Sequence, residues 1–134
     1  MITSRAAWTR SGSGSRQSAR RTFRCWSAWR RVSVSGFASY GPFRPWAAYL
    51  YTVENSIYVA PEQRGRGVGT AILGRLIDIA RSRGLHAIVA GIDATNEASL
   101  KLHAKFGFER VAHFRQVGWK FERWLDLMFL ERIF

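Results

Sequence analysis

Three glycines at alternating positions, Gly65, Gly67 and Gly69, separate a run of strand-forming residues from an amphipathic helical pattern. The run before them, Tyr51 to Val59, is rich in β-branched and aromatic residues, which favour strands. Apolar residues after them recur at the spacing of one helical face until Gly84. These apolar residues are Ala71, Ile72, Leu76, Ile79 and Ala80. The pattern therefore predicts a strand, a glycine loop and a helix in direct succession.

The predicted glycine loop has the chemistry of an anion site. Glycines let the backbone turn tightly and leave several N–H groups unpaired at the positive end of the helix dipole. Arg64 and Arg66 add charge beside that end. The spacing fits neither a Walker loop, which needs a lysine after the glycines, nor a Gly-x-Gly-x-x-Gly dinucleotide loop. The loop predicts a phosphate or pyrophosphate site, and the alternative is a strand-to-helix turn without a ligand.

The rest of the chain after residue 33 alternates strands and helices. A near-continuous apolar run predicts a strand that is central in a sheet, because both of its faces must be covered. Asn96 is placed to cap the second helix. The expected elements are strands 34–40, 85–92, 108–114 and 124–130 and a helix over 97–106. Together they predict an α/β fold with a mixed β-sheet flanked by helices.

Alternation along the strand before the glycine loop separates its side chains into two sets. Glu54, Ser56 and Tyr58 fall on one face, because successive strand residues point to opposite sides. Val53, Asn55, Ile57 and Val59 fall on the other. Taken alone, a strand glutamate is more often solvated or paired across strands than catalytic.

Charge and composition limit the possible functions. The 134 residues are 47% hydrophobic with a formal net charge of +12, which indicates one folded domain. Eight arginines and no acid lie in residues 1–33, so +8 of the +12 comes from that segment. Such a segment could bind nucleic acid, but it has no periodicity, and nucleic acid is not the expected partner. No apolar run is long enough to cross a membrane, and the single Cys25 suits a reducing, cytoplasmic setting.

Several motifs resemble the GNAT family of N-acetyltransferases. Arg64-x-x-Gly67-x-Gly69 before an amphipathic helix is similar to the coenzyme A signature of that family. The motif Asn96-x-x-Ser99-x-x-Leu102-His103-x-x-Phe106-Gly107-Phe108 is similar to its second motif. Residues 36–44 and 52–54, with Val117 to Lys120 and Trp124 to Asp126, resemble the branch of phosphinothricin and methionine sulfoximine acetyltransferases. The resemblance covers residues from about 34 to 132 in uninterrupted order.

The resemblance implies an acetyl-CoA-dependent transfer to the amino group of a small amino-acid-like substrate, with no metal. Glu54 corresponds to the base, and His103 stands where a histidine is proposed to protonate the leaving thiolate or relay the substrate proton. Arg44, Trp46 and Tyr49 are candidates for holding the substrate carboxylate and side chain, and the alternative is an exposed loop with aromatic anchors. The residues implied in cofactor binding are Ile57, Tyr58, Val59, Arg64, Gly65, Arg66, Gly67, Val68, Gly69, Thr70 and Asn96. Relatives in this branch also imply a homodimer.

The chain departs from the family pattern at its N-terminus. A complete GNAT domain has a strand, two helices and another strand before the segment that matches Val34 to Tyr40, and residues 1–33 lack the apolar pattern to supply them. We therefore expect residues 1–33 to be a basic, poorly ordered segment and residues 34–134 to form the acetyl-CoA-binding portion of an N-terminally incomplete domain. Two alternatives remain open: a basic nucleic-acid-binding protein, and a catalytically inactive truncated acetyltransferase.

Overall fold

The computed structural model describes residues 26–30 and 33–134. From residue 33 on, strands and helices follow one another as the sequence predicts, with short 3₁₀ turns before and after β3. The elements are β1 (Trp26–Arg30), β2 (Ser33–Pro42), η1 (Ala47–Tyr49), β3 (Thr52–Val59), η2 (Pro61–Gln63), α1 (Val68–Ser82), β4 (Ala87–Asp93), α2 (Glu97–Lys105), β5 (Glu109–Lys120) and β6 (Arg123–Ile133).

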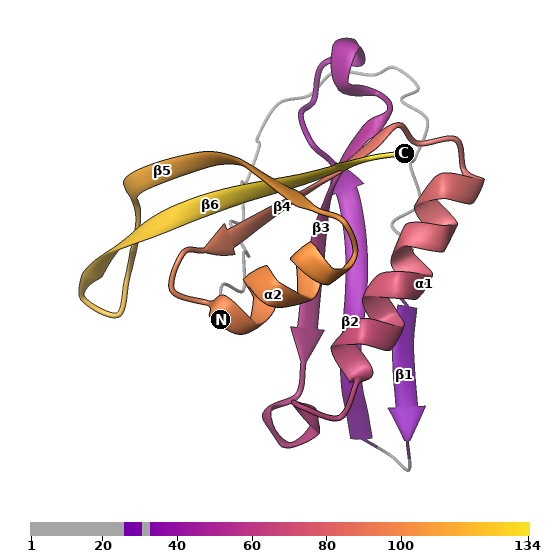
Figure 1. Cartoon of the computed structure of the whole chain (residues 1–134), viewed down its shortest axis with the longest axis vertical. Coiled ribbons are helices and arrows are strands. Elements are labelled where there is room, and N and C mark those ends of the chain that lie inside the picture. Colours follow the sequence, from indigo (N-terminus) through magenta and orange to yellow (C-terminus); the bar gives the residue numbers. More distant parts are fainter. Residues whose placement is uncertain (1–25, 31–32) are drawn as a thin grey trace, which may run out of the picture.

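The described strands form one mixed sheet in the order β1-β2-β3-β4-β6-β5. Neighbours pair antiparallel except β3 and β4, which run parallel and are joined through α1. Figure 1 shows α1 lying along β2 and β3, and the β5–β6 hairpin extending away from the other strands. The predicted position of the apolar strand is confirmed, because β4 lies inside the sheet.

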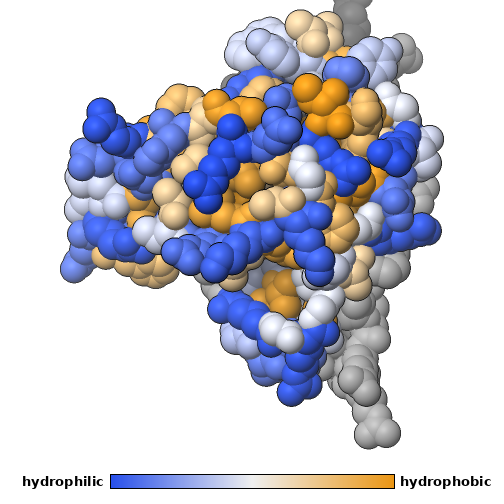
Figure 2. Space-filling view, viewed as in Figure 1, coloured by the Kyte–Doolittle hydropathy of each residue, from blue (hydrophilic) through white to orange (hydrophobic). Residues whose placement is uncertain are grey.

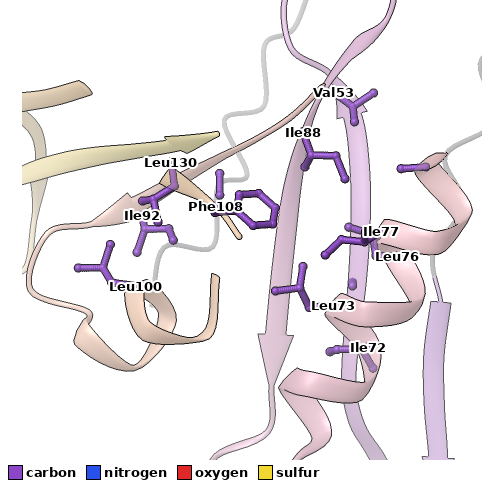
Figure 3. Close-up of a cluster of buried hydrophobic side chains, with 13 residues drawn as sticks. Val53, Ile72, Leu73, Leu76, Ile77, Ile88, Ile92, Leu100, Phe108 and Leu130 are labelled. Carbon is purple, nitrogen blue, oxygen red and sulfur yellow. The ribbon is translucent and has the colours of Figure 1, made fainter. Parts of the chain in front are cut away.

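One hydrophobic core joins both helices to one face of the sheet. Leu73 and Ile77 of α1 point toward the strands, and Leu100 of α2 belongs to the same cluster (Figure 3). Val53 and Ile88, which are register partners on β3 and β4, meet them from the sheet. Each such side chain contributes about 1.5–3 kcal/mol when it is fully buried. This core fixes β3, β4 and α1 relative to one another, and the predicted site lies among these elements.

The face of α1 differs in detail from the prediction. Ala71 is exposed, whereas Leu73 and Ile77 are buried. The buried stripe follows positions 72, 73, 76, 77 and 80, which form one helical face with two adjacent residues per turn. Ala71 falls just outside that stripe.

Two features of the strands were not predicted. β1 lies inside the segment 1–33, and its backbone pairs with β2; the other residues of that segment, except Ser33, lie outside the described residues. β5 and β6 are longer than expected because they continue to a two-residue turn at Phe121 and Glu122, where φ is 53° and 57°. Such turns usually contain Asn and Gly, so this one carried no sequence signal. In the described part of the chain, no helix is long and apolar enough to cross a membrane.

Candidate active site

The site is built around the place where β3 and β4 stop pairing. The two strands pair only over residues 52–55 and 87–90, although β3 continues to Val59 and β4 to Asp93. Beyond Asn55, β3 keeps its pairing with β2 alone among the described strands. Figure 1 shows β4 turning away from β3, and Figure 2 shows apolar surface between α2 and the segment that follows β3. The parted strands leave backbone groups open to a ligand.

The predicted glycine loop lies at the carboxyl end of β3 and leads directly into α1. Gly65 and Gly67 have φ of 74° and 80°, a left-handed conformation that only glycine adopts at little cost. Gly67 is the N-cap of α1 and no side chain caps the helix, so the first intrahelical donor is Ala71 N, 3.0 Å from Gly67 O. The N–H groups of residues 68–70 are therefore available to an anion.

The third glycine of the loop serves packing. A Cβ at Gly69 would lie 3.1 Å from Leu102 Cδ2 and 3.6 Å from Val59 Cγ2, so Gly69 lets α1 approach α2 and β3 closely. A Cβ at Gly65 or at Gly67 would meet no atom within 4 Å. Both predicted arginines of the loop are exposed, which leaves their charge free to act on a ligand.

Glu54 lies on β3 one position before Asn55, the last residue of β3 that pairs with β4. Its carboxylate reaches across to β4, where a Cβ at Gly91 would lie only 3.1 Å from Glu54 Oε1. Burial of about half of the side chain raises the pKa of Glu54 above its ordinary 4.5, and the positive charge of Arg44 opposes this shift. The side chain of Glu54 makes no hydrogen bond or salt bridge to a described residue. It is a carboxyl group whose proton affinity is increased and whose oxygens are available.

His103 lies on α2 and is 3% exposed. Its Nδ1 is 2.8 Å from Ser99 O, an acceptor, so Nδ1 carries the proton and donates it. Nε2 is then the acceptor for Asn55 Nδ2 at 3.0 Å. Burial lowers the pKa of His103 below 6.5, against the effect of the bond to Ser99, and the ring is neutral at neutral pH. Asn55 Oδ1 is buried without a partner among the described residues.

The two predicted catalytic residues lie on opposite faces of β3. Glu54 points to the face away from the helices, whereas His103 reaches the strand through Asn55 on the core face. Both adjoin the last pair of the parallel ladder, Asn55 with Ala90. The structure thus brings them to the same level of the sheet without direct contact between them.

The three predicted substrate residues lie in the segment between β2 and β3, near the amino end of β3 (Figure 1). All three side chains are exposed, and the rings of Trp46 and Tyr49 meet edge to face with centroids 6.3 Å apart. Arg44 stacks over the Phe43 ring at 4.2 Å, and its charge acts on Glu54. Arg44 therefore links this segment to Glu54, and the length of β3 separates the segment from the glycine loop.

The remaining cofactor candidates divide into two groups. Ile57, Tyr58 and Val59 form the part of β3 beyond its pairing with β4, as expected of residues that expose backbone groups. Asn96 caps α2 as predicted, since its Oδ1 accepts a hydrogen bond from Ser99 N at 3.1 Å. Its side chain is therefore already engaged in holding the helix.

Sequence reasoning missed four residues of the site. Glu54, Leu127 and Phe129 all approach the space above Gly91, and Asn55 forms a hydrogen bond with His103. Two signals were present: Gly91 interrupts an apolar strand, and Asn55 is polar on a face that is otherwise apolar. Leu127 and Phe129 gave none, because only the sheet order brings β6 beside β4.

The strand, glycine loop and helix around a parted parallel pair define an acetyltransferase-like α/β domain, and comparison with known families agrees. Residues 3–108 match the Acetyltransferase (GNAT) family. The chain belongs to this family. The match begins inside the segment 1–33, which by its residue pattern is expected to lie outside the domain.

Among individual relatives, the chain is similar to the L-amino acid N-acyltransferase MnaT of Escherichia coli K12 and the L-methionine sulfoximine/L-methionine sulfone acetyltransferase of Salmonella typhimurium LT2. It is 50% identical to each over 98 residues, which are 73% of this chain and 57% of the relative. It also resembles the structure of a phosphinothricin acetyltransferase from Sinorhizobium meliloti in complex with acetyl-CoA, with a TM-score of 0.79 and 36% identity. That match covers 83% of this chain and 60% of the other. The chain thus spans little more than half the length of these curated relatives.

Proposed function

We propose that this chain is the acetyl-CoA-binding part of an N-acetyltransferase that acetylates the amino group of a small amino-acid-like substrate, of the phosphinothricin or methionine sulfoximine type. The observation that carries the proposal is Glu54, a half-buried carboxyl group with a raised pKa and no hydrogen bond to a described residue, beside the parting of β3 and β4. The names of the relatives support the substrate class.

The described residues fit acetyl-CoA as the co-substrate. Gly65 and Gly67 leave open space around the loop, and the free N–H groups that follow are donors for a pyrophosphate, with Arg64 and Arg66 beside them. The unpartnered Asn55 Oδ1 is a buried acceptor at the point where the strands part, and a ligand with amide N–H groups would satisfy it. No cluster of His, Cys, Asp or Glu suited to a metal ion is found among the described residues, and the proposed chemistry uses none.

Glu54 is the proposed general base. Bound acetyl-CoA supplies a thioester carbonyl, and only a neutral amine can attack it, so an ammonium substrate must first lose a proton. A carboxylate whose pKa is raised accepts that proton more readily than an exposed one. Arg44 would pair with the substrate carboxylate, and Trp46 and Tyr49 would contact its side chain. In this proposal the amine lies between the substrate residues and Glu54.

His103 has a narrower proposed role. In the neutral ring the only proton is on Nδ1 and is donated to Ser99 O, so Nε2 can take up a proton but has none to give. If Nε2 becomes protonated, rotation of the Asn55 amide would present Oδ1 as its acceptor. We propose that His103 and Asn55 act together as a relay that accepts the second proton, which the amine loses as the amide bond forms, and passes it to the thiolate that leaves.

A cytoplasmic homodimer completes the proposal. Trp119, Phe121 and Trp124 on the β5–β6 hairpin are 60%, 72% and 58% exposed, and a cluster of exposed aromatic side chains is typical of an interaction surface. Light scattering on a size-exclusion column measures the mass directly. A dimeric mass that falls to monomer on changing Trp119 and Trp124 to serine supports the proposal, and a monomeric parent chain contradicts it.

The function is tested by titrating the purified chain with acetyl-CoA in a calorimeter and following thiol release with a panel of amino-acid analogues. We expect saturable binding, and turnover with methionine sulfoximine or phosphinothricin. Glu54→Gln should lower turnover by about 10²–10⁴-fold, the usual contribution of a general base, and leave acetyl-CoA binding unchanged.

Glu109→Gln is the matched control, because Glu109 is an exposed strand carboxylate at the start of β5. It should retain the turnover of the parent. Absence of acetyl-CoA binding by a folded chain would contradict the proposal, and so would equal losses in Glu54→Gln and Glu109→Gln. Binding without turnover would leave the cofactor-binding part of the proposal standing and refute the catalytic part for this chain.

A further inference from the structure

A glycine inside a buried strand needs a reason, because it loses backbone entropy and contributes no side chain to the core. Gly91 is such a residue, set in the otherwise apolar run of β4. Its φ is not in the left-handed region, so no turn or backbone conformation explains it. The reason must lie in what approaches it.

Three side chains converge on the space above Gly91. A Cβ there would lie 3.1 Å from Glu54 Oε1, 3.4 Å from Phe129 Cε1 and 3.6 Å from Leu127 Cδ1. The distance to Glu54 is shorter than ordinary van der Waals contact, whereas the two apolar contacts are close to it. The missing side chain at position 91 is therefore replaced by the carboxylate of Glu54.

The register explains why only this position is involved. Glu54 pairs with Val89, and the last β3–β4 pair is Asn55 with Ala90, so Gly91 is the first residue of β4 beyond the ladder. Gly91 and Glu54 share one face of the sheet, since they are separated by an even number of register steps. The Glu54 side chain thus crosses diagonally to β4 at the point where the strands part.

The neighbours of Gly91 differ in how far they can move. Phe129 is the register partner of Gly91 on β6, and its ring meets Phe114 edge to face at 5.6 Å. Glu54 makes no hydrogen bond or salt bridge to a described residue. An added methyl group at position 91 would therefore displace the carboxylate and leave the aromatic pair in place.

We propose that Gly91 is a positioning residue for the acetyl transfer: by lacking a side chain, it lets the Glu54 carboxylate lie against β4 in the space that Leu127 and Phe129 also approach. The inference rests on the proposed function, because it assigns Gly91 a role in the work of the general base. Burial of Glu54 beside β4 is in line with the raised pKa of that carboxyl group.

The test is Gly91→Ala, with Gly118→Ala as the matched control. Gly118 is a strand glycine in β5, where a Cβ would lie 3.5 Å from Leu125 Cβ, an ordinary contact. We expect Gly91→Ala to lower kcat about tenfold, since small displacements of a catalytic group are costly, with little change in KM for acetyl-CoA. Gly118→Ala should retain the parent kcat.

A second measurement separates positioning from a general structural effect. Titration of the labelled Glu54 carboxyl carbon by NMR should show its pKa falling toward 4.5 in Gly91→Ala and staying at the parent value in Gly118→Ala. Glu54→Asp shortens the side chain by one methylene, so the pair Gly91→Ala with Glu54→Asp should retain more activity than the two single losses predict together.

An unchanged Glu54 pKa in folded Gly91→Ala would overturn the inference, as would strictly additive losses in the double variant. The titration needs no turnover. An inactive parent chain would therefore refute the proposed function, and the titration would still decide whether Gly91 positions Glu54. If Gly91→Ala does not fold, nuclear Overhauser contacts between the Gly91 α-protons and the Glu54 γ-protons in the parent decide it. Their presence supports the inference and their absence overturns it.

Discussion

Glu54 and Asn55 are consecutive residues of β3, but their surroundings differ in every respect that matters for chemistry. Asn55 faces the core, is 7% exposed, and holds His103 through a hydrogen bond of 3.0 Å. Glu54 faces the other side and is half-buried, and its carboxylate makes no hydrogen bond or salt bridge to a described residue. The comparison separates a polar group that organises the fold from one that is left available for a reaction.

The same contrast applies to the glycines. Gly69 allows α1 and α2 to pack, whereas Gly65 and Gly67 border open space at the helix N-terminus, and Gly91 makes room for a carboxylate. One residue type therefore serves packing, ligand access and positioning within one site. Only the neighbours of each glycine distinguish these roles.

The largest expected effect concerns Asn55, on the core face of β3. Asn55→Ala removes the donor to His103 Nε2 and leaves a cavity in the core, so it should lower the free energy of unfolding by about 2–3 kcal/mol. Urea denaturation measures this value. Ser56→Ala, at an exposed neighbouring position, should change it by less than about 0.5 kcal/mol. Equal effects of the two substitutions would contradict the structural role of Asn55.

A smaller effect should appear in the dependence of stability on pH. The folded pKa of His103 is lowered by burial, so the unfolded chain takes up the proton first as the pH falls. Neutral His103 contributes stability above about pH 6.5, the pKa of histidine in the unfolded chain. This contribution is lost as the pH falls through the pKa of His103 in the folded chain. Thermal unfolding between about pH 7.5 and about pH 5.5 should show a slope that His103→Leu reduces. His86→Gln, at an exposed position, should keep the slope; an unaltered slope in His103→Leu contradicts the assignment.

The smallest expected effect is that of Glu54 on stability, and its dependence on pH has the opposite sign to that of His103. Because the folded pKa is raised, the protonated form favours folding below pH 4.5, and that contribution is lost as the pH rises through the folded pKa. Glu54→Gln should therefore stabilise the chain at neutral pH, by less than about 1 kcal/mol, since water screens a half-exposed carboxylate. The gain should vanish in acid, where Glu54 itself is protonated. A less stable Glu54→Gln at neutral pH would show that Arg44 outweighs desolvation.

The sequence predicted those parts of the fold that depend on local pattern. Alternation placed Glu54 and Asn55 on opposite faces, the glycines marked the start of α1, and Asn96 capped α2, because each of these follows from residues within a few positions. The hydrogen bond between Asn55 and His103 joins residues 48 positions apart, and the contact of Glu54 with Gly91 depends on where two strands part. Neither the hydrogen bond nor the contact could be predicted without the order of the strands in the sheet.

Two local features also escaped prediction for physical reasons. The turn at Phe121 and Glu122 has positive φ at both residues without Asn or Gly, so its sequence gave no turn signal. β1 contains two tryptophans three positions apart, which is not the alternation of a strand. In both cases pairing with a neighbouring strand outweighs the local preference.

The central claim is that the half-buried carboxyl group of Glu54 is the base for acetyl transfer. The most direct test is the pH dependence of kcat/KM for the amine substrate in the parent chain and in Glu54→Gln. We predict an acidic limb in the parent whose apparent pKa lies above 4.5, and its loss in the residual activity of Glu54→Gln. An acidic limb of the same position and steepness in both proteins would contradict the claim.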